Sequence, residues 1–267
     1  MISYRARAFF AAVVFLSISS RAFARKSDTG FLDGALSLHN AAYKYQVFLP
    51  EDWSSNKKWP IILFLHGAGE RGSDGLLQTQ LGIATAVRKD RTRFAAIIVM
   101  PQCKTGSWWS EPTMEDMALA SLAAASKEFK GDSKRTYLTG LSMGGYGSWA
   151  IAAQNPNKFA AIVPICGGIV LPEHLRQQHP EMEKIAYAHD PKSYADVAGK
   201  IGKTPVWIFH GGDDAVVPVD GARKLNEAIK AAGGNVRYTE YPGVGHNSWD
   251  NTYADPELMT WMLSKSL

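Results

Sequence analysis

One short segment of the chain has the residue types that nucleophilic catalysis needs. Gly140-Leu141-Ser142-Met143-Gly144 is a GxSxG motif between an apolar run that predicts a strand and a pattern that predicts a helix. A serine in such a tight turn exposes its hydroxyl, and the glycines on either side relieve crowding. The helix that follows directs free amides toward developing negative charge. This context favours a nucleophilic Ser142 over a chance motif with a buried or capping serine.

A serine hydroxyl becomes an effective nucleophile when a histidine, itself held by a carboxylate, accepts its proton. Among the seven histidines, His246 is favoured because it lies in a glycine-bracketed loop after a predicted strand. Of the other six, His39 lies before a predicted strand, and His66 and His210 each lie in a His-Gly pair directly after a strand. The last three lie in a polar stretch: His174, His179 and His189. Asp213 and Asp214 follow another strand and precede His246, in the order serine, acid, histidine that this kind of site requires. Chain order alone leaves both aspartates open.

The tetrahedral intermediate of acyl transfer needs backbone amides that form an oxyanion hole. We expect one of them from Met143, directly after the serine. The second is expected from the loop at 66–72, whose glycines let the backbone approach a ligand closely. Within this loop Ala68 is the first candidate and Gly69 the second.

These loops require a sheet that brings them to one edge. Continuous apolar runs, typical of strands buried on both faces, occur at 61–65, 95–100, 160–165 and 206–209. Further strands are expected at 43–49, 135–139 and 236–241, and helices at 113–131, 143–154, 219–232 and 255–263. This alternation predicts a three-layer α/β/α sandwich with a mostly parallel central sheet. The candidate residues then follow the carboxyl ends of strands, where open α/β sheets place their sites.

Residues 1–24 have the pattern of a secretory signal peptide. Arg5 and Arg7 precede an apolar stretch at 8–20, and small residues near its end predict cleavage after Ala24. The stretch is shorter than the ~20 residues that cross a bilayer, so we expect no stable membrane anchor and a secreted or periplasmic protein. Residues 25–267 should form a single catalytic domain. Within it, 169–203 is rich in histidine, proline and charge and is a candidate lid or insertion.

The composition excludes several other classes of protein. With 46% hydrophobic and 20% charged residues, the chain of 267 residues is globular rather than disordered. Three of its basic residues lie in 1–24, which leaves 26 basic against 25 acidic residues and no broad footprint for nucleic acid. There is no HExxH motif, facial-triad spacing or P-loop, so we expect no metal and no cofactor. Nothing in the sequence specifies an oligomeric state.

Two cysteines, Cys103 and Cys166, each follow a predicted strand. The expected strand order separates them by about two strands, or ~14 Å. A disulfide needs Cα atoms within about 7 Å, so free thiols are favoured, although an oxidising compartment would permit a bond.

Taken together, these segments resemble the α/β-hydrolase superfamily. Within it, the chain is similar to the secreted branch of phospholipase/carboxylesterase-like esterases, often labelled predicted peptidase or prolyl-oligopeptidase-like. That branch adjoins the polyhydroxybutyrate depolymerase and feruloyl esterase groups. The resemblance rests on segments that span most of the mature chain: 64–73, 101–103, 140–145, 210–218 and 245–246. The family pattern His-Gly-x-x-Asp-x-x-Val-Pro implies Asp214, rather than Asp213, as the acid.

The resemblance implies a serine hydrolase that cleaves carboxylic esters through an acyl-enzyme. Its substrates would be acetyl or feruloyl esters of plant polysaccharide, or short-chain esters. Two alternatives stay open, namely a serine peptidase with the same triad and an inactive hydrolase fold used as a binding module.

Three tryptophans are candidates for the wall of a substrate pocket. Trp108 and Trp109 are adjacent in a loop on the expected catalytic edge, and Trp249 lies three residues after His246. Each could equally anchor its loop to the core. Glu70 and Arg71 are expected to form a pair that holds the oxyanion loop.

Overall fold

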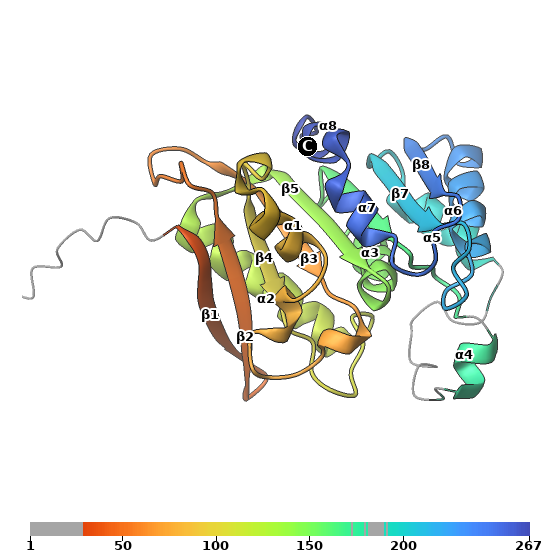
Figure 1. Cartoon of the computed structure of the whole chain (residues 1–267), viewed down its shortest axis with the longest axis horizontal. Helices are drawn as coiled ribbons and strands as arrows, with labels where there is room; N and C mark the ends of the chain where they lie inside the picture. Colours follow the sequence, from red (N-terminus) through yellow and green to blue (C-terminus); the bar gives the residue numbers. More distant parts are fainter. Residues whose placement is uncertain (1–28, 172, 179, 181–189, 191) are drawn as a thin grey trace, which may run out of the picture.

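The computed structural model describes residues 29–171, 173–178, 180, 190 and 192–267. The expected signal peptide at 1–24 lies outside this part of the chain. Among the described residues, no helix is both long enough and apolar enough to cross a membrane. The described chain forms one sheet with helices packed against it (Figure 1).

The described strands pair in the spatial order β1-β2-β4-β3-β5-β6-β7-β8. Their bounds are Gly30–Leu38 (β1), Ala41–Leu49 (β2), Trp59–Leu65 (β3), Ile97–Pro101 (β4), Gly131–Leu141 (β5), Ala161–Ile165 (β6), Val206–Gly211 (β7) and Val236–Tyr241 (β8). β2 runs antiparallel to both β1 and β4, whereas neighbouring strands from β4 to β8 are parallel. The predicted mostly parallel sheet is therefore confirmed.

The central strand β3 shows why the sequence has continuous apolar runs. Ile61, Leu63 and Leu65 belong to the core on one face of the sheet, and Ile62 and Phe64 belong to the core on the other. All five side chains are buried. Because successive side chains of a strand point to opposite faces, a sheet covered on both faces needs apolar residues at every position.

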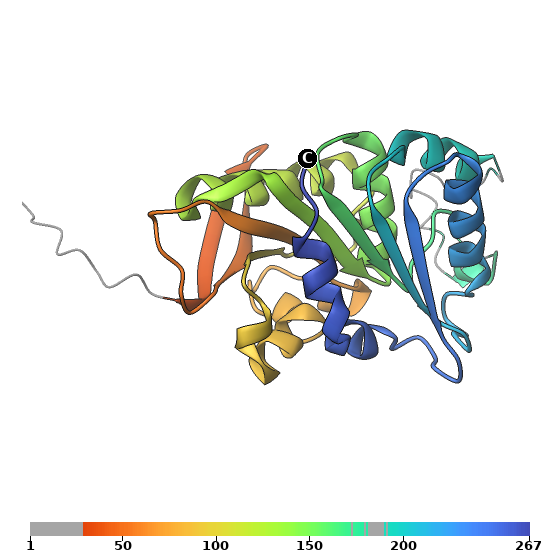
Figure 2. The same cartoon turned by 90° about the horizontal axis from the view of Figure 1, so that it is seen from above.

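Two layers of helix provide this cover. The helix bounds are Ile83–Lys89 (α1), Pro112–Phe129 (α2), Met143–Gln154 (α3), Glu173–Gln178 (α4), Ser193–Ile201 (α5), Asp220–Ala231 (α6), Trp249–Ala254 (α7) and Pro256–Leu263 (α8). Residues of α2, α3, α5 and α6 contribute to one core, and residues of α1, α7 and α8 contribute to the other. Figure 2 shows the sheet between these two layers. This is the predicted α/β/α sandwich.

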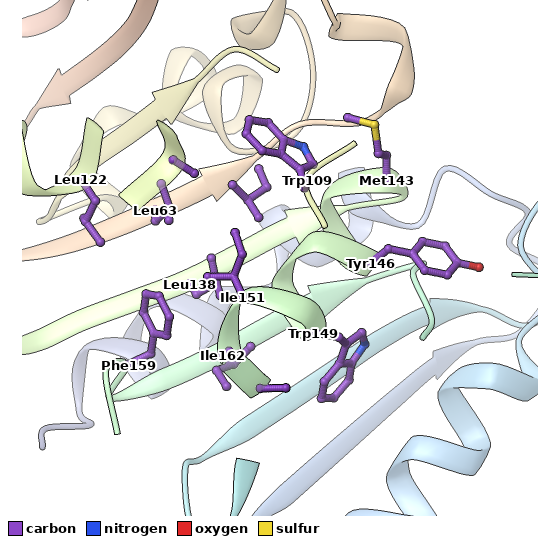
Figure 3. Close-up of a cluster of buried hydrophobic side chains, with 14 of the residues drawn as sticks. Leu63, Trp109, Leu122, Leu138, Met143, Tyr146, Trp149, Ile151, Phe159 and Ile162 are labelled. Atoms are coloured by element: carbon purple, nitrogen blue, oxygen red, sulfur yellow. The ribbon is translucent and has the colours of Figure 1, made fainter. Parts of the chain in front are cut away.

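Helix α3 is buried on every side. Each residue from Met143 to Ala153 is buried, and Tyr146, Trp149 and Ile151 lie among core side chains of the neighbouring strands (Figure 3). An amphipathic helix would leave one face in solvent, so the apolar and small residues around α3 reflect complete burial. The turn that precedes α3 is therefore attached to a fully buried helix.

Among the described strands and α-helices, five are absent from the sequence predictions, namely β1, α1, α4, α5 and α7. β1 was missed because glycine, an aspartate and serine interrupt its apolar pattern, and its side chains are half-exposed. α5 had a visible signal, since Tyr194, Val197, Ala198 and Ile201 follow helical spacing. The last three of these are buried, and α5 packs against α3 and α6.

The position of α5 removes one part of the segment at 169–203 from the expected lid or insertion. Residues 193–201 belong to the helical layer of the domain rather than to a cover over it. In Figure 1, α4 lies apart from the helices that cover the sheet. Positions 172, 179, 181–189 and 191 lie outside the described residues, so a lid in the first half of the segment stays a prediction.

Candidate active site

Ser142 lies in the turn between β5 and α3, with φ 53° and ψ −117°. A positive φ is unfavourable for a residue with a Cβ, and such strain persists where the surrounding structure holds it. Here the Ser142 amide donates to the Ile165 carbonyl of β6 at 2.9 Å, and the buried helix α3 begins at the next residue. The expected strand–turn–helix context of the serine is therefore present.

Both motif glycines are required by close backbone packing. A Cβ at Gly144 would lie 2.0 Å from the carbonyl oxygen of Leu65, and one at Gly140 would lie 2.4 Å from the carbonyl oxygen of Gly144. Atoms cannot approach so closely without displacing the backbone. The glycines thus allow β3, β5 and α3 to meet directly at the serine.

We expect Gly144→Ala to lower the free energy of unfolding by about 3 kcal/mol, because the new methyl group must displace β3. The matched control is Gly199→Ala in α5, where nothing lies within 4 Å of the added Cβ. Alanine restricts the unfolded chain, so this control should raise the free energy of unfolding by about 0.4–1 kcal/mol. Urea unfolding measures both. Equal stabilities of the two variants would show that the turn tolerates a side chain at position 144.

The structure joins three predicted residues in one chain of hydrogen bonds. His246 Nε2 lies 2.9 Å from Ser142 Oγ, and His246 Nδ1 lies 2.7 Å from Asp214 Oδ2. An ionised carboxylate only accepts, so Nδ1 carries the proton and Nε2 accepts from the serine hydroxyl. The three side chains come from the loops after β5, β7 and β8, which end at the same edge of the sheet.

The structure also separates the two adjacent aspartates. Asp213 is exposed, whereas the Asp214 side chain is 0% exposed and faces His246. Asp214 Oδ1 accepts from the amides of Val216 at 2.9 Å and Val217 at 2.8 Å. Burial alone would raise the pKa of Asp214, but hydrogen bonds from two histidine rings and an amide outweigh it and hold this pKa well below its usual range. Asp214 is therefore ionised when it receives the His246 N–H.

His66 supports the loop that follows β3. Its Nδ1–H donates to the Gly67 carbonyl at 2.6 Å, its Nε2 accepts from the Cys103 amide at 3.0 Å, and its carbonyl accepts from Trp109 Nε1 at 2.9 Å. Burial lowers the pKa of His66 to about 4, so the ring is neutral near pH 7. His66 thus joins the loop after β3 to the loop after β4 without adding charge.

The expected sources of oxyanion donors lie on either side of Ser142. Met143 is the first residue of α3, where helix amides have no partner within the helix. On the other side, Ala68 and Gly69 lie in a short 3-10 helix directly after Gly67. A Cβ built on Gly67 would lie 3.8 Å from Ser142 Cβ, so this loop passes beside the serine.

Glu70 and Arg71 hold this loop separately, and the expected ion pair between them is wrong. Arg71 Nε donates to the Ala68 carbonyl at 2.9 Å, and its guanidinium lies 4.8 Å from the Trp108 ring centre. Glu70 is nearly buried, and its carboxyl accepts from the Gly67 amide. Burial raises the pKa of Glu70 despite that hydrogen bond. Each side chain therefore braces a different part of the loop backbone.

The tryptophans support loops more than they line an open pocket. Trp108 is 3% exposed and Trp109 is 1% exposed, so the expectation that they wall a pocket is wrong. Figure 3 shows Trp109 among buried side chains near Met143. Trp249 is partly buried and packs edge to face on His246, with ring centres 5.5 Å apart. It braces the histidine loop, and its contact with a substrate stays a prediction.

The contact between His210 and the acid is absent from the sequence predictions, in which His210 is only a histidine of a His-Gly pair directly after a strand. Its Nε2 lies 3.2 Å from Asp214 Oδ2 and 2.8 Å from the Val217 carbonyl oxygen. The available signal was the spacing of four residues between this histidine and the aspartate. That spacing alone does not predict that the ring points into the protein beneath the loop at 212–219, which carries Asp214 and is called the acid loop below.

Both cysteines are free and buried, which confirms the prediction of free thiols. Cys103 follows β4 and Cys166 follows β6, and β3 and β5 lie between those strands. Burial raises the pKa of each thiol to about 12, so both stay protonated near neutral pH. In the part of the chain that the structure describes, no group of three or more His, Cys, Asp or Glu side chains could hold a metal ion.

A mostly parallel sheet of this topology, with a serine in a tight strand-to-helix turn and an acid and a histidine after later strands, defines the α/β-hydrolase fold. The chain belongs to the esterase family whose model carries the description "Putative esterase" and matches residues 37–255. It is thus placed among hydrolases that act on esters.

Individual relatives agree with this placement. The chain is 25% identical over 212 residues to "Probable feruloyl esterase C" of Aspergillus flavus, covering 77% of this chain and 67% of that protein. The crystal structure of a thermostable esterase is 32% identical, with a TM-score of 0.73, covering 89% of this chain and 63% of that chain. A ferulic acid esterase structure shares the fold at 20% identity, with a TM-score of 0.65, covering 88% and 98%.

Proposed function

We propose that this protein is an exported serine carboxylesterase that works through an acyl-enzyme intermediate. The observation that carries the proposal is the continuous hydrogen-bonded chain from Ser142 through His246 to the buried Asp214. Nucleophile, base and orienting acid are within hydrogen-bond reach of each other in the order that acyl transfer requires. The membership of an esterase family supports an ester as the substrate.

In the acylation step, Ser142 Oγ attacks the ester carbonyl carbon while His246 Nε2 takes the hydroxyl proton. The carbonyl oxygen becomes an oxyanion, which the amides of Met143 and of Ala68 or Gly69 stabilise. The ionised Asp214 holds His246 Nδ1–H and stabilises the positive imidazolium. When the C–O bond to the alcohol breaks, His246 returns its proton to the leaving oxygen, and the acyl group stays on Ser142.

Deacylation repeats these roles with water as the nucleophile. His246 takes a proton from water, the hydroxide oxygen attacks the acyl carbon, and the same amides hold the second oxyanion. Collapse of this intermediate breaks the bond to Ser142 Oγ, which regains the proton from His246. The products are a carboxylic acid and a free enzyme.

For the substrate, we propose esters of plant polysaccharide, with feruloyl and acetyl esters as the first to test. The likeness to a protein named as a feruloyl esterase supports this class. The signal-peptide pattern at 1–24 supports export, which would bring the enzyme to polymers outside the cell. Short-chain esters stay within the proposal because the same chemistry cleaves them.

The test is hydrolysis of a substrate panel together with labelling by a fluorophosphonate probe. The panel comprises p-nitrophenyl acetate, butyrate and octanoate, methyl ferulate, acetylated xylan and a set of peptide amides. We expect the probe to label Ser142 and the preferred ester to reach a kcat/KM of about 10⁴ M⁻¹s⁻¹ or more. Mass spectrometry of the labelled peptide identifies the modified residue.

The other outcomes of this panel have definite meanings. Faster cleavage of peptide amides than of esters would make the protein a serine peptidase with the same triad. A folded protein that is neither labelled nor active on any substrate would be a binding module with a hydrolase fold.

A further inference from the structure

His210 lies on the side of Asp214 away from solvent. It is in β7, it is 0% exposed, and its side chain shares a fully buried site with the Asp214 carboxylate. The ring Nε2 lies 2.8 Å from the Val217 carbonyl oxygen and 3.2 Å from Asp214 Oδ2. One ring nitrogen therefore faces two oxygen atoms of the acid loop.

These contacts determine where the proton of the ring lies. A carbonyl oxygen and an ionised carboxylate only accept, so Nε2 must carry a hydrogen that they share. The other nitrogen, Nδ1, is buried and has no hydrogen-bond partner among the described residues. A second proton at Nδ1 would place an unpaired N–H on a buried cation, which is unfavourable. His210 is thus a neutral imidazole with its proton on Nε2.

The proton of His210 completes the set of donors around Asp214. Oδ1 accepts from the amides of Val216 and Val217, and Oδ2 accepts from His246 at 2.7 Å and faces the His210 N–H at 3.2 Å. Val217 is held twice, because its amide binds the carboxylate and its carbonyl binds His210. The acid loop is therefore closed onto β7 by this ring.

The unpaired Nδ1 indicates that the ring is more than a space filler. Buried polar groups in folded proteins are nearly always hydrogen-bonded, so each exception needs an explanation. A leucine or phenylalanine could fill a similar volume without leaving a buried nitrogen without a partner. A neutral imidazole that donates a hydrogen bond to the buried carboxylate would offset the free-energy cost of its unpaired nitrogen.

We propose that His210 is a positioning residue of the triad: its Nε2–H fixes Asp214 Oδ2 toward His246 and keeps the carboxylate oriented and ionised in a fully buried site. The inference rests on the proposed function, since it deepens the role of Asp214. With the carboxylate fixed, the positive charge that forms on His246 during each proton transfer meets a preorganised partner. His210 touches no reacting atom and acts through Asp214.

Two matched variants test this role. In His210→Gln the side-chain amide reaches the position of ring Nε2 and can donate to the same oxygens. In His210→Asn the amide reaches only the position of Nδ1. Both variants lose the ring, but only His210→Gln keeps an N–H donor at the position of Nε2. We expect the asparagine variant to lower kcat for p-nitrophenyl butyrate by about 10- to 100-fold with KM unchanged, as misplacement of a catalytic group does. The glutamine variant should recover most of kcat.

A spectroscopic measurement separates positioning from general stability. The proton between His246 Nδ1 and Asp214 should give a low-field NMR signal in the wild type and in His210→Gln, and this signal should shift or broaden in His210→Asn. Thermal unfolding of each variant records any change in stability. Equal losses of kcat in the two variants, or a loss that appears in KM, would overturn the proposal.

The wild-type protein supplies a test that needs no variant. In nitrogen NMR spectra of the histidine rings, we expect His210 to carry its proton on Nε2 and none on Nδ1. A protonated Nδ1 would overturn the proposal even if both variants failed to fold. A wild type that neither hydrolyses esters nor reacts with a fluorophosphonate would refute the proposed function, while these spectra would still decide the His210 contact.

Discussion

Replacing Ser142 by alanine is expected to lower kcat/KM for the preferred ester by about 10⁴- to 10⁶-fold. The variant removes the oxygen that would form the bond to the acyl carbon, and His246 then has no hydroxyl to activate. Some acceleration over water should persist, because the proposed oxyanion donors, the amides of Met143 and of Ala68 or Gly69, belong to the backbone and stay in place. The measurement is kcat/KM on p-nitrophenyl butyrate, with fluorophosphonate labelling as a second readout.

The same variant should fold like the wild type. Alanine keeps the Cβ, so the unfavourable φ of 53° in the turn has a similar energy in both proteins. The matched control is Ser37→Ala, since Ser37 is exposed in β1 and contributes nothing to the proposed chemistry. Full ester hydrolysis by a Ser142→Ala protein with normal unfolding would place the nucleophile elsewhere.

Replacing Asp214 by asparagine is expected to lower kcat by about 10⁴-fold, as the loss of the orienting charge does in a serine triad. The carboxylate of Asp214 is surrounded by donors from Val216, Val217, His246 and His210. An asparagine places its own N–H₂ group where Asp214 Oδ2 faced His246 Nδ1, and this group can donate only to an unprotonated Nδ1. His246 would then favour the tautomer with the proton on Nε2, which cannot accept from Ser142.

Asp213→Asn is the control for this variant. It makes the same change in the adjacent residue, but Asp213 is exposed and does not face His246. We expect its kcat to stay near the wild-type value, and thermal unfolding to show that both variants are folded. A large loss in the Asp213 variant, with near-normal activity in the Asp214 variant, would reverse the assignment of the acid.

The sequence alone predicted the α/β/α sandwich and the residues that meet at its edge. Buried parallel strands can be recognised in the sequence. Both faces of β3 and β4 need apolar side chains, and the apolar run is therefore continuous. The turn at Ser142 can be recognised as well, since Gly140 and Gly144 are glycines at positions where any Cβ would lie too close to a backbone oxygen. These are local requirements, and local requirements can be read from neighbouring residues.

Other features depended on contacts between distant parts of the chain. Trp109 could have faced a pocket or the core, and its burial together with its hydrogen bond to the His66 carbonyl places it in the core. α5 looked like part of a lid because its polar neighbours concealed an apolar face that packs on α3 and α6.

The assignment of the acid to Asp213 or Asp214 also depended on tertiary contacts, as did the role of His210. The two aspartates are alike in type and adjacent in chain order, so the residues alone favoured neither, and the family pattern supplied the preference. In the structure, one carboxylate is buried among donors while the other is exposed to solvent. The sequence thus determined which residues reach the sheet edge, because strand ends and turns follow local pattern. Tertiary structure alone decided which of them touch, because burial and hydrogen bonding depend on the loops after β7 and β8 packing together.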